Sequence, residues 1–365
     1  MRVTVHRFGM SNPADVSGLR RLIDAGELDP RHIVASIGKT EGNGGANDFT
    51  RALATISFAG AIAAATGERP EDVTERVALV WSGGCEGVLS PHATVITRDD
   101  SIDAGEGGGL AVSVQRTRAF RPEEIGTLAE IDEVADATRR ALDDLAAAPD
   151  EVHYVQVKGP LLTPAGIRDA AGRGATVVTT DPNASKAYAR GATALGVAVA
   201  LGEVDRGSLE QASITKALDR FSTVASTSAG GELVACEIVL FANSPAAAPG
   251  LRIGHAVLRD VIDAEGVREA LRSAGLDVGA AADAEQRERI AAVFAKAEAS
   301  PTGEVRGRRT TMLSDADINY ERHARAALGA VIASVTGDPA IFVSGGTEHQ
   351  CAPGQAPIAA IVRGR

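Results

Sequence analysis

Short apolar runs alternate with helix-like segments along the whole chain of 365 residues. The apolar runs predict strands at 1–7, 34–39, 93–97, 154–158, 238–242, 292–296 and 357–362. Segments with helical periodicity predict helices at 15–25, 47–65, 122–147, 183–202, 262–274 and 319–335. Because strands and helices alternate, we expect an α/β or α+β fold in which helices cover the sheets.

A short motif, Ser-[Gly/Ala]-Gly-x-Glu, occurs three times, at 82–86, 228–232 and 344–348. Each copy follows a predicted strand that ends in a lysine, and a helix-like segment with an arginine lies between the two. The lysines are Lys39, Lys158 and Lys296, and the arginines are Arg51, Arg190 and Arg325. Three copies in the same order indicate an internal repeat.

The repeat divides the chain into three predicted units, at 1–105, 110–248 and 252–365. Segments rich in Gly and Pro at 103–109 and 244–250 mark the joins between the units. The simplest assembly places the three units around a pseudo-threefold axis within one chain. We expect a central β-barrel-like core, peripheral helices, and equivalent loops that meet at the axis.

Each repeated group has a chemical use. The backbone N–H groups of Ser-Gly turns bind anions or polarised carbonyl oxygens, here at Ser82-Gly83, Ser228-Ala229 and Ser344-Gly345. Arginine supplies a planar fork of hydrogen-bond donors, and a buried lysine with a depressed pKa accepts a proton from serine. Three such sets suit a flat ring with carbonyls at alternate positions, such as a triazinetrione or a pyrimidinetrione.

The three lysines differ in the residue two positions further along the strand, which shares their face. Glu41 is expected to reach Lys39 and Glu298 to reach Lys296, whereas Pro160 stands in that place after Lys158. Lys158 is therefore expected to be neutral. We predict that Ser228 and Lys158 react while the other two copies bind substrate. Ser226 lies close enough to compete for the role of nucleophile, but the motif selects Ser228.

Composition and the absence of other motifs exclude several classes. The chain has 37 Lys and Arg against 48 Asp and Glu, a formal charge of −11, which argues against a nucleic-acid-binding protein. The N-terminus lacks the apolar segment of a signal peptide and no window holds 18 uninterrupted apolar residues, so we expect a cytoplasmic protein without a membrane partner. The spacing of Cys85, Cys236 and Cys351 indicates neither disulfides nor zinc.

Nucleotide-binding and metallohydrolase functions are also disfavoured, because the chain contains neither glycine-rich phosphate motif nor HExxH. His92, His323 and His349 lie near motif residues, and we expect them to form hydrogen bonds and pack. A non-catalytic protein that binds cyclic imides or assembles through its Gly-rich turns stays an alternative. It leaves the lysine beside each turn without a role.

The chain resembles the cyanuric acid hydrolases and barbiturases, a family of ring-opening amidohydrolases. The stretches that carry the resemblance are 38–44, 81–92, 155–158, 294–301, 312–319 and 344–350. The resemblance implies three similar units in one chain, a homotetramer, Ser228 as nucleophile and Lys158 as base. It also implies that the arginines and the three Ser-Gly or Ser-Ala segments hold the substrate; we add Lys39 and Lys296 to the substrate-binding set.

The resemblance further implies a structural magnesium or calcium ion and no catalytic cofactor. The matching positions are Glu298, Thr347, Gln350, Cys351, Ala352 and Gln355, mostly through backbone carbonyls, which suit a hard cation.

The expected substrate is cyanuric acid, because each repeat keeps its own Lys, Arg and Ser and the ring has matching symmetry. Ring opening gives carboxybiuret, which decarboxylates to biuret in s-triazine degradation. The alternative is a barbiturase that opens barbituric acid to ureidomalonate.

Overall fold

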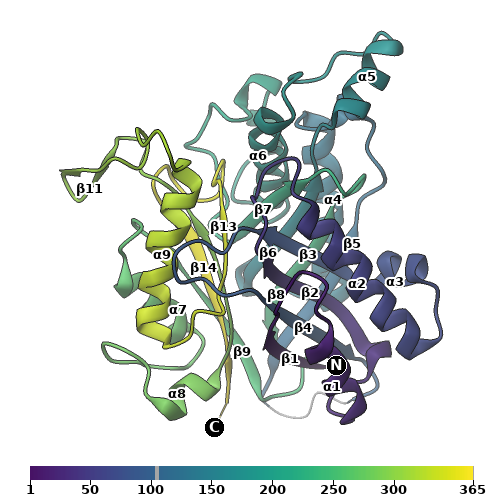
Figure 1. Ribbon diagram of the computed structural model, residues 1–365, viewed down its shortest axis with the longest axis vertical. Coiled ribbons are helices and arrows are strands. Elements are labelled where there is room, and N and C mark those ends of the chain that lie inside the picture. Colours follow the sequence, from purple (N-terminus) through teal and green to yellow (C-terminus); the bar gives the residue numbers. More distant parts are fainter. Residues whose placement is uncertain (103–106, 365) are drawn as a thin grey trace.

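The computed structural model describes residues 1–102 and 107–364 as a mixed α/β protein (Figure 1). Its strands form three four-stranded sheets and one short hairpin of β11 (Glu304–Val305) and β12 (Arg308–Arg309). The predicted join at 103–109 includes residues 103–106, which lie outside the described residues. The second predicted join, 244–250, connects the second sheet to the third.

The three sheets share one strand order. The first sheet is β1 (Arg2–Gly9), β4 (His92–Asp99), β2 (Ile33–Thr40) and β3 (Ala78–Gly83). The second is β5 (Gly109–Arg116), β8 (Glu237–Ser244), β6 (Val152–Pro160) and β7 (Ala225–Gly230). The third is β9 (Leu251–Leu258), β14 (Ala356–Arg363), β10 (Ile290–Ala297) and β13 (Phe342–Gly345). In each sheet two antiparallel pairings are followed by one parallel pairing.

All predicted strands are present, but the motif serines lie in strands rather than in turns. Ser82, Ser228 and Ser344 belong to β3, β7 and β13, none of which the apolar pattern predicts. The reason is plainest in β7, whose sequence Ala-Ser-Thr-Ser-Ala-Gly contains no large apolar side chain. The chain turns only after the serine, where Gly84 and Gly346 have positive φ values.

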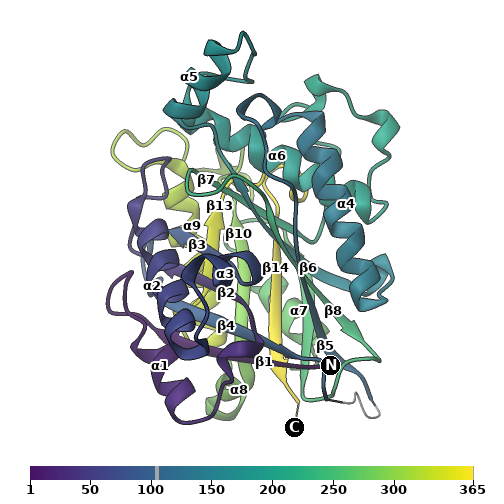
Figure 2. The ribbon, with the colours of Figure 1, turned by 90° about the vertical axis from the view of Figure 1, so that its right-hand side faces the viewer.

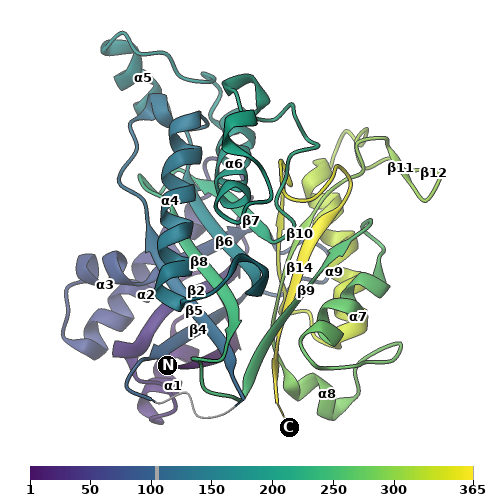
Figure 3. The same cartoon turned by 180° about the vertical axis from the view of Figure 1, so that it is seen from behind.

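Helices cover each sheet, as predicted. The first sheet carries α1 (Ser17–Asp24), α2 (Phe49–Thr66) and α3 (Pro70–Arg76) (Figure 2). The second carries α4 (Leu128–Leu145), α5 (Pro164–Gly172) and α6 (Pro182–Ala200), and the third carries α7 (Ala264–Ser273), α8 (Ala284–Arg289) and α9 (Tyr320–Thr336) (Figure 3). The short helices α3, α5 and α8 were not predicted, because so few residues show little periodicity. Helix α4 begins later than expected because 122–124 is a 3₁₀ turn.

The three helices that carry the repeated arginines begin with the same device. The side chains of Asp48, Asp181 and Asn319 accept hydrogen bonds from backbone N–H groups in the first turns of α2, α6 and α9. Pro182 occupies the first position of α6, where its missing N–H costs nothing. The sequence therefore sets the start of each helix, and with it the place of the arginine.

One core lies between the inner faces of all three sheets. It contains Ile37 of β2, Tyr154 of β6, Phe294 of β10 and Phe342 of β13. The ring centroids of Tyr154 and Phe294 are 5.4 Å apart, and those of Phe294 and Phe342 are 6.2 Å apart. Separate clusters fill the space between each sheet and its helices. Among the described strands each sheet stays open, and no named strand of one sheet pairs with another sheet.

Helix α2 is the one described helix that is long and apolar enough to cross a membrane by length and composition alone. Core helices pass the same test. On α2, the buried Phe58 packs against Trp81 of β3 with ring centroids 4.7 Å apart.

We predict that Phe294→Ala lowers the free energy of unfolding by about 3–5 kcal/mol, because it leaves a cavity where side chains of different sheets meet. Equilibrium denaturation in urea measures this loss. Val234→Ala is the control, since Val234 is 68% exposed. An equal loss in both variants would contradict a shared central core.

Candidate functional site

Each predicted lysine lies directly opposite its serine on a neighbouring parallel strand. Lys39 pairs in register with Ser82, Lys158 with Ser228, and Lys296 with Ser344. Lys39 and Lys296 follow the core residues Ile37 and Phe294 by two positions, and Lys158 follows Tyr154 by four, so alternation along the strands puts all three lysines on the inner faces. The three pairs therefore end the shared core at the carboxyl ends of the parallel strands, where ligands bind in many α/β proteins.

The lysines link the three sheets in a closed cycle. Lys39 Nζ donates to the carbonyl oxygen of Val343 at 2.7 Å, Lys158 Nζ to that of Trp81 at 3.1 Å, and Lys296 Nζ to that of Thr227 at 2.7 Å. Each acceptor is the residue immediately before a motif serine in a different sheet. The ends of the three sheets are thus held together by the buried amino groups of these lysines.

The repeated arginines form a second cycle with the motif glutamates. Arg325 Nε donates to Glu86 at 2.8 Å, and Arg190 donates to Glu348 through Nε and Nη2, each at 2.7 Å. Arg51 Nε lies 3.3 Å from Glu232. In every pair the arginine and the glutamate come from elements on different sheets. The sequence analysis assigned no role to these glutamates, although they occupy the last position of the motif.

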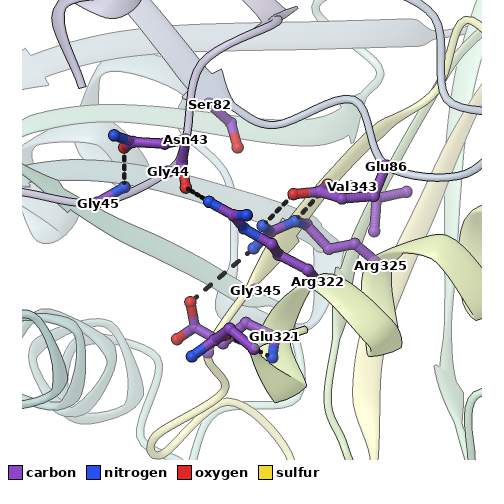
Figure 4. Close-up of polar contacts among 12 residues, drawn as sticks. Asn43, Gly44, Gly45, Ser82, Glu86, Glu321, Arg322, Arg325, Val343 and Gly345 are labelled. Carbon is purple, nitrogen blue, oxygen red and sulfur yellow. Dashed lines mark hydrogen bonds and ion pairs between the residues drawn. The ribbon is translucent and has the colours of Figure 1, made fainter. Parts of the chain in front are cut away.

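We call each set of a lysine, its serine, the motif glutamate and the arginine that pairs with it a corner. The Ser82 corner contains Lys39, Glu86 and Arg325; Figure 4 shows Arg325 beside Glu86. The Ser228 corner contains Lys158, Glu232 and Arg51. The Ser344 corner contains Lys296, Glu348 and Arg190.

The corners surround one cavity. Its lining residues are Gly44, Arg51, Ser82, Gly83, Lys158, Lys186, Arg190, Ser228, Ala229, Glu321, Arg325, Ser344 and Gly345. Every predicted catalytic and substrate-binding residue is therefore in the lining except Lys39 and Lys296, which are fully buried behind it. Lys186 and Glu321 are cavity residues that the sequence analysis missed.

Burial shifts the pKa of all three lysines downward. It lowers the pKa of Lys39 to about 7 and that of Lys158 to about 8, and it lowers the pKa of Lys296 well below its ordinary value. Neighbouring arginines act in the same direction. A lysine with a pKa near neutrality can accept a proton and return it, which is what general acid–base catalysis requires.

The expectation that Lys158 alone lacks a carboxylate is wrong. Lys158 Nζ lies 3.4 Å from Glu232, which opposes the effect of burial on the lysine pKa. In the described part of the chain, neither Lys39 nor Lys296 forms an ion pair with Glu41 or Glu298. Strand β2 ends at Thr40 and β10 at Ala297, so the alternation of faces no longer applies at the glutamates.

The Ser228 corner also differs from the others in how its arginine is held. The buried hydroxyls Ser228 Oγ and Ser344 Oγ have no hydrogen-bond partner among the described residues, whereas Ser82 Oγ is 3.1 Å from Lys39 Nζ. Arg51 forms no hydrogen bond with its glutamate among the described residues, and its Nη2 donates instead to the carbonyl of Gly45 at 3.1 Å. The corner thus combines an unengaged hydroxyl, a lysine and a carboxylate.

The remaining candidates have structural partners. Ser226 Oγ lies deeper than Ser228 and donates to Gln156 Oε1 at 3.2 Å. His92 bonds to the carbonyl of Ser90, His323 to Asp315, and His349 to Arg220 and Thr215, which confirms the expected hydrogen-bonding roles.

Comparison with known proteins gives the family. The chain matches the amidohydrolase ring-opening protein family over residues 4–363. The chain belongs to this family. A cyclic amide hydrolase from Azorhizobium caulinodans is 62% identical, and a cyanuric acid amidohydrolase from Enterobacter cloacae is 49% identical, each over 100% of both chains. Barbiturase 1 from a Nocardioides species is 41% identical over 99% of this chain and 98% of its own.

A solved structure of a cyanuric acid hydrolase agrees with the whole fold of this ring-opening amidohydrolase. The TM-score is 0.94 at 47% identity, and the match covers 100% of this chain and 99% of that chain. The three open sheets and their helices are therefore the architecture of a hydrolase family.

The residues predicted to hold a metal lie beside the Ser344 corner of the amidohydrolase. Thr347 Oγ1 donates to the carboxylate of Glu298, and burial raises the pKa of that carboxyl to about 7. The Gln350 amide is used internally, since its Oε1 accepts from Thr227 N at 2.7 Å. The Cys351 thiol bonds to the carbonyl of Thr223, and Gln355 N donates to the carbonyl of Ala352. Among the residues that the structure describes, no three His, Cys, Asp or Glu side chains gather as a metal site.

We predict that Glu86→Ala lowers the free energy of unfolding by about 3–5 kcal/mol, because it leaves the buried guanidinium of Arg325 without its carboxylate. Urea denaturation measures the change, and Glu75→Ala, at an exposed position on α3, serves as control. The assignment of Glu86 to the buried cycle would be wrong if both variants unfolded at the same urea concentration.

Proposed function

We propose that this ring-opening amidohydrolase hydrolyses cyanuric acid. The observation that carries the proposal is the convergence of three Lys–Ser pairs and three arginines on one cavity. Donors at three corners suit a flat ring with three alternating carbonyls, and the relatives named as cyanuric acid hydrolases support the choice of ring.

We also propose that a pseudo-threefold axis passes through this cavity and relates the predicted units around a barrel-like core. The shared strand order of the three sheets supports this arrangement. The two cycles of buried contacts support it as well, because each links the three sheets in sequence and returns to its start.

In the proposed mechanism, Lys158 accepts the proton of Ser228 while the serine oxygen attacks a ring carbonyl. The carbonyl carbon becomes tetrahedral, and its negative oxygen is stabilised by donors of the corner, including Arg51. The intermediate collapses as the ring C–N bond breaks, and Lys158 returns the proton to the leaving nitrogen. Water then hydrolyses the acyl-enzyme to carboxybiuret, which loses carbon dioxide to give biuret.

Glu232 supports the assignment of this reaction to the Ser228 corner. When Lys158 takes the proton, a buried ammonium forms, and a carboxylate 3.4 Å away stabilises it. In the part of the chain that the structure describes, neither Lys39 nor Lys296 has such an ion pair. The other two corners are proposed to bind the remaining carbonyls.

A structural magnesium or calcium ion is proposed at Glu298. The buried carboxylate lacks an ion pair in the described chain, and its raised pKa indicates that a cation there would favour the charged form. Backbone carbonyls of the 347–355 loop would complete the oxygen ligands that a hard cation prefers. The thiol of Cys351 is an unsuitable ligand, because burial raises its pKa far above neutrality.

The homotetramer stays a proposal, and one exposed apolar surface supports it. Phe49, Leu53 and Ile56 follow one face of α2 and are 81%, 46% and 70% exposed. A row of large apolar side chains on one helix is typical of a protein interface. The cytoplasmic location stays a prediction.

Loss of substrate absorbance tests the proposed function directly, with cyanuric acid and barbituric acid in parallel. We expect turnover of cyanuric acid, and a fall of about three orders of magnitude or more in Ser228→Ala because the nucleophile is removed. Ser82→Ala and Ser344→Ala should lose far less. Comparable losses in all three would contradict the division of roles, and opening of barbituric acid alone would make the protein a barbiturase.

The pH dependence tests Lys158 as the base. Since neutral lysine is the active form, we expect kcat/KM to rise with pH through an inflection near the Lys158 pKa of about 8. Glu232→Gln removes the carboxylate that raises this pKa, so the inflection should move to lower pH. Glu86→Gln, at the equivalent position of another corner, should leave the inflection in place. An unmoved inflection in Glu232→Gln would reject the pair.

A further inference from the structure

One position in the cavity breaks the internal repeat. Four residues before each repeated arginine stand Asn47, Lys186 and Glu321, which are neutral, cationic and anionic. All three line a pocket that adjoins the cavity, and Lys186 and Glu321 also line the cavity itself, between the serines. The corners repeat, whereas the residues between them do not.

Among the described residues, Glu321 is the only carboxylate that lines the cavity. Its side chain is 13% exposed and lies 3.2 Å from Arg190 Nη2 and 3.9 Å from Arg325 Nη1. Arg190 and the other nearby cations hold its pKa low despite burial, so it is charged at neutral pH. These ion pairs lack hydrogen-bond geometry, and neither carboxylate oxygen accepts a hydrogen bond from any described residue. Figure 4 shows the carboxylate beside Arg325.

The contacts of Glu321 place it away from the reacting corner. Arg325 belongs to the Ser82 corner and Arg190 to the Ser344 corner, so Glu321 lies between these two. In the described residues it forms no ion pair with Arg51 or Lys158. Around a threefold cavity, a residue between two corners faces the third, which here contains Ser228.

A ring with alternating carbonyls and N–H groups needs both donors and acceptors. The arginines of the lining only donate hydrogen bonds, so they suit the carbonyls. An N–H group needs an acceptor, and a carboxylate is acceptor-only. Lys186, at the equivalent position of α6, cannot take that role. In such a six-membered ring, the atom opposite a carbonyl carbon is an N–H nitrogen.

We propose that Glu321 accepts a hydrogen bond from the ring N–H opposite the carbonyl that Ser228 attacks. Glu321 is then a specificity-determining residue, which requires an imide N–H at that ring position and so orients the ring toward Ser228. This inference rests on the proposed function, because it assumes a cyclic imide attacked by Ser228.

Binding to the unreactive Ser228→Ala enzyme separates recognition from turnover. Titration calorimetry gives Kd for cyanuric acid, which has three N–H groups, and for 1,3-dimethylbarbituric acid, which has three carbonyls and no ring N–H. Adding Glu321→Gln, which keeps the shape of the side chain but leaves only a neutral acceptor, should raise the Kd for cyanuric acid about tenfold. Glu321→Lys, which copies Lys186 of α6, should raise the Kd for cyanuric acid about 100-fold. Neither change should raise the Kd for 1,3-dimethylbarbituric acid.

The control is Glu285→Gln, at an exposed position of α8 outside the cavity, which should leave both affinities unchanged. Affinity for cyanuric acid within threefold of the parent in Glu321→Lys would overturn the proposal. So would an equal loss for both rings, because Glu321 would then act only by holding Arg190 and Arg325. If Ser228→Ala fails to bind cyanuric acid and the unmodified enzyme fails to open it, the proposed function itself is wrong.

Discussion

Buried charge is the constraint on which the rest of this structure depends. Three lysines and three arginines, all at most 6% exposed, meet at one end of the central core. Removing such groups from water costs several kcal/mol per ion unless partners compensate. The compensation is arranged between sheets: each lysine uses a carbonyl from another sheet, and each arginine uses a glutamate from another sheet. The charges therefore need all three sheets in place at once.

The same arrangement prepares the site for chemistry. Fixed donors in a buried cavity interact strongly with a carbonyl oxygen as it becomes negative, because they need not reorganise and little water screens them. Burial also brings the pKa of Lys158 to about 8, within the range in which a lysine exchanges protons near neutral pH. Structural cohesion and catalytic competence thus have one physical origin.

Small departures from the repeat give the cavity a direction. The Ser228 corner has a Lys–Glu contact, and its arginine and glutamate form no hydrogen bond in the described chain, whereas Glu86 and Glu348 each accept hydrogen bonds from two nitrogens of their arginines. The residue four positions before the arginine adds a cation on α6 and an anion on α9. A symmetric scaffold can bind a symmetric ring in several equivalent ways. The differences among the corners, and among the residues that lie between them, favour one of these binding orientations.

Sequence patterns predicted the elements that follow local rules. The apolar periodicity located the main strands and helices, and the spacing of Lys, Arg and Ser located most of the cavity lining. They failed where side chains gave no local signal. Strand β7 has no large apolar residue, and its pairing with β6 decides its conformation. The glutamates of the motif were visible at 86, 232 and 348, but their arginine partners are more than 150 residues away in each pair.

The chain by itself therefore determined the repeat, the alternation of strands and helices, and which residues meet at the carboxyl ends of the strands. Only the tertiary structure decided which carboxylate neighbours Lys158, and it reversed the expectation that this lysine has none. The physical reason is distance. Local patterns describe neighbours along a strand or helix, whereas the charge state of a buried group depends on every element packed around it.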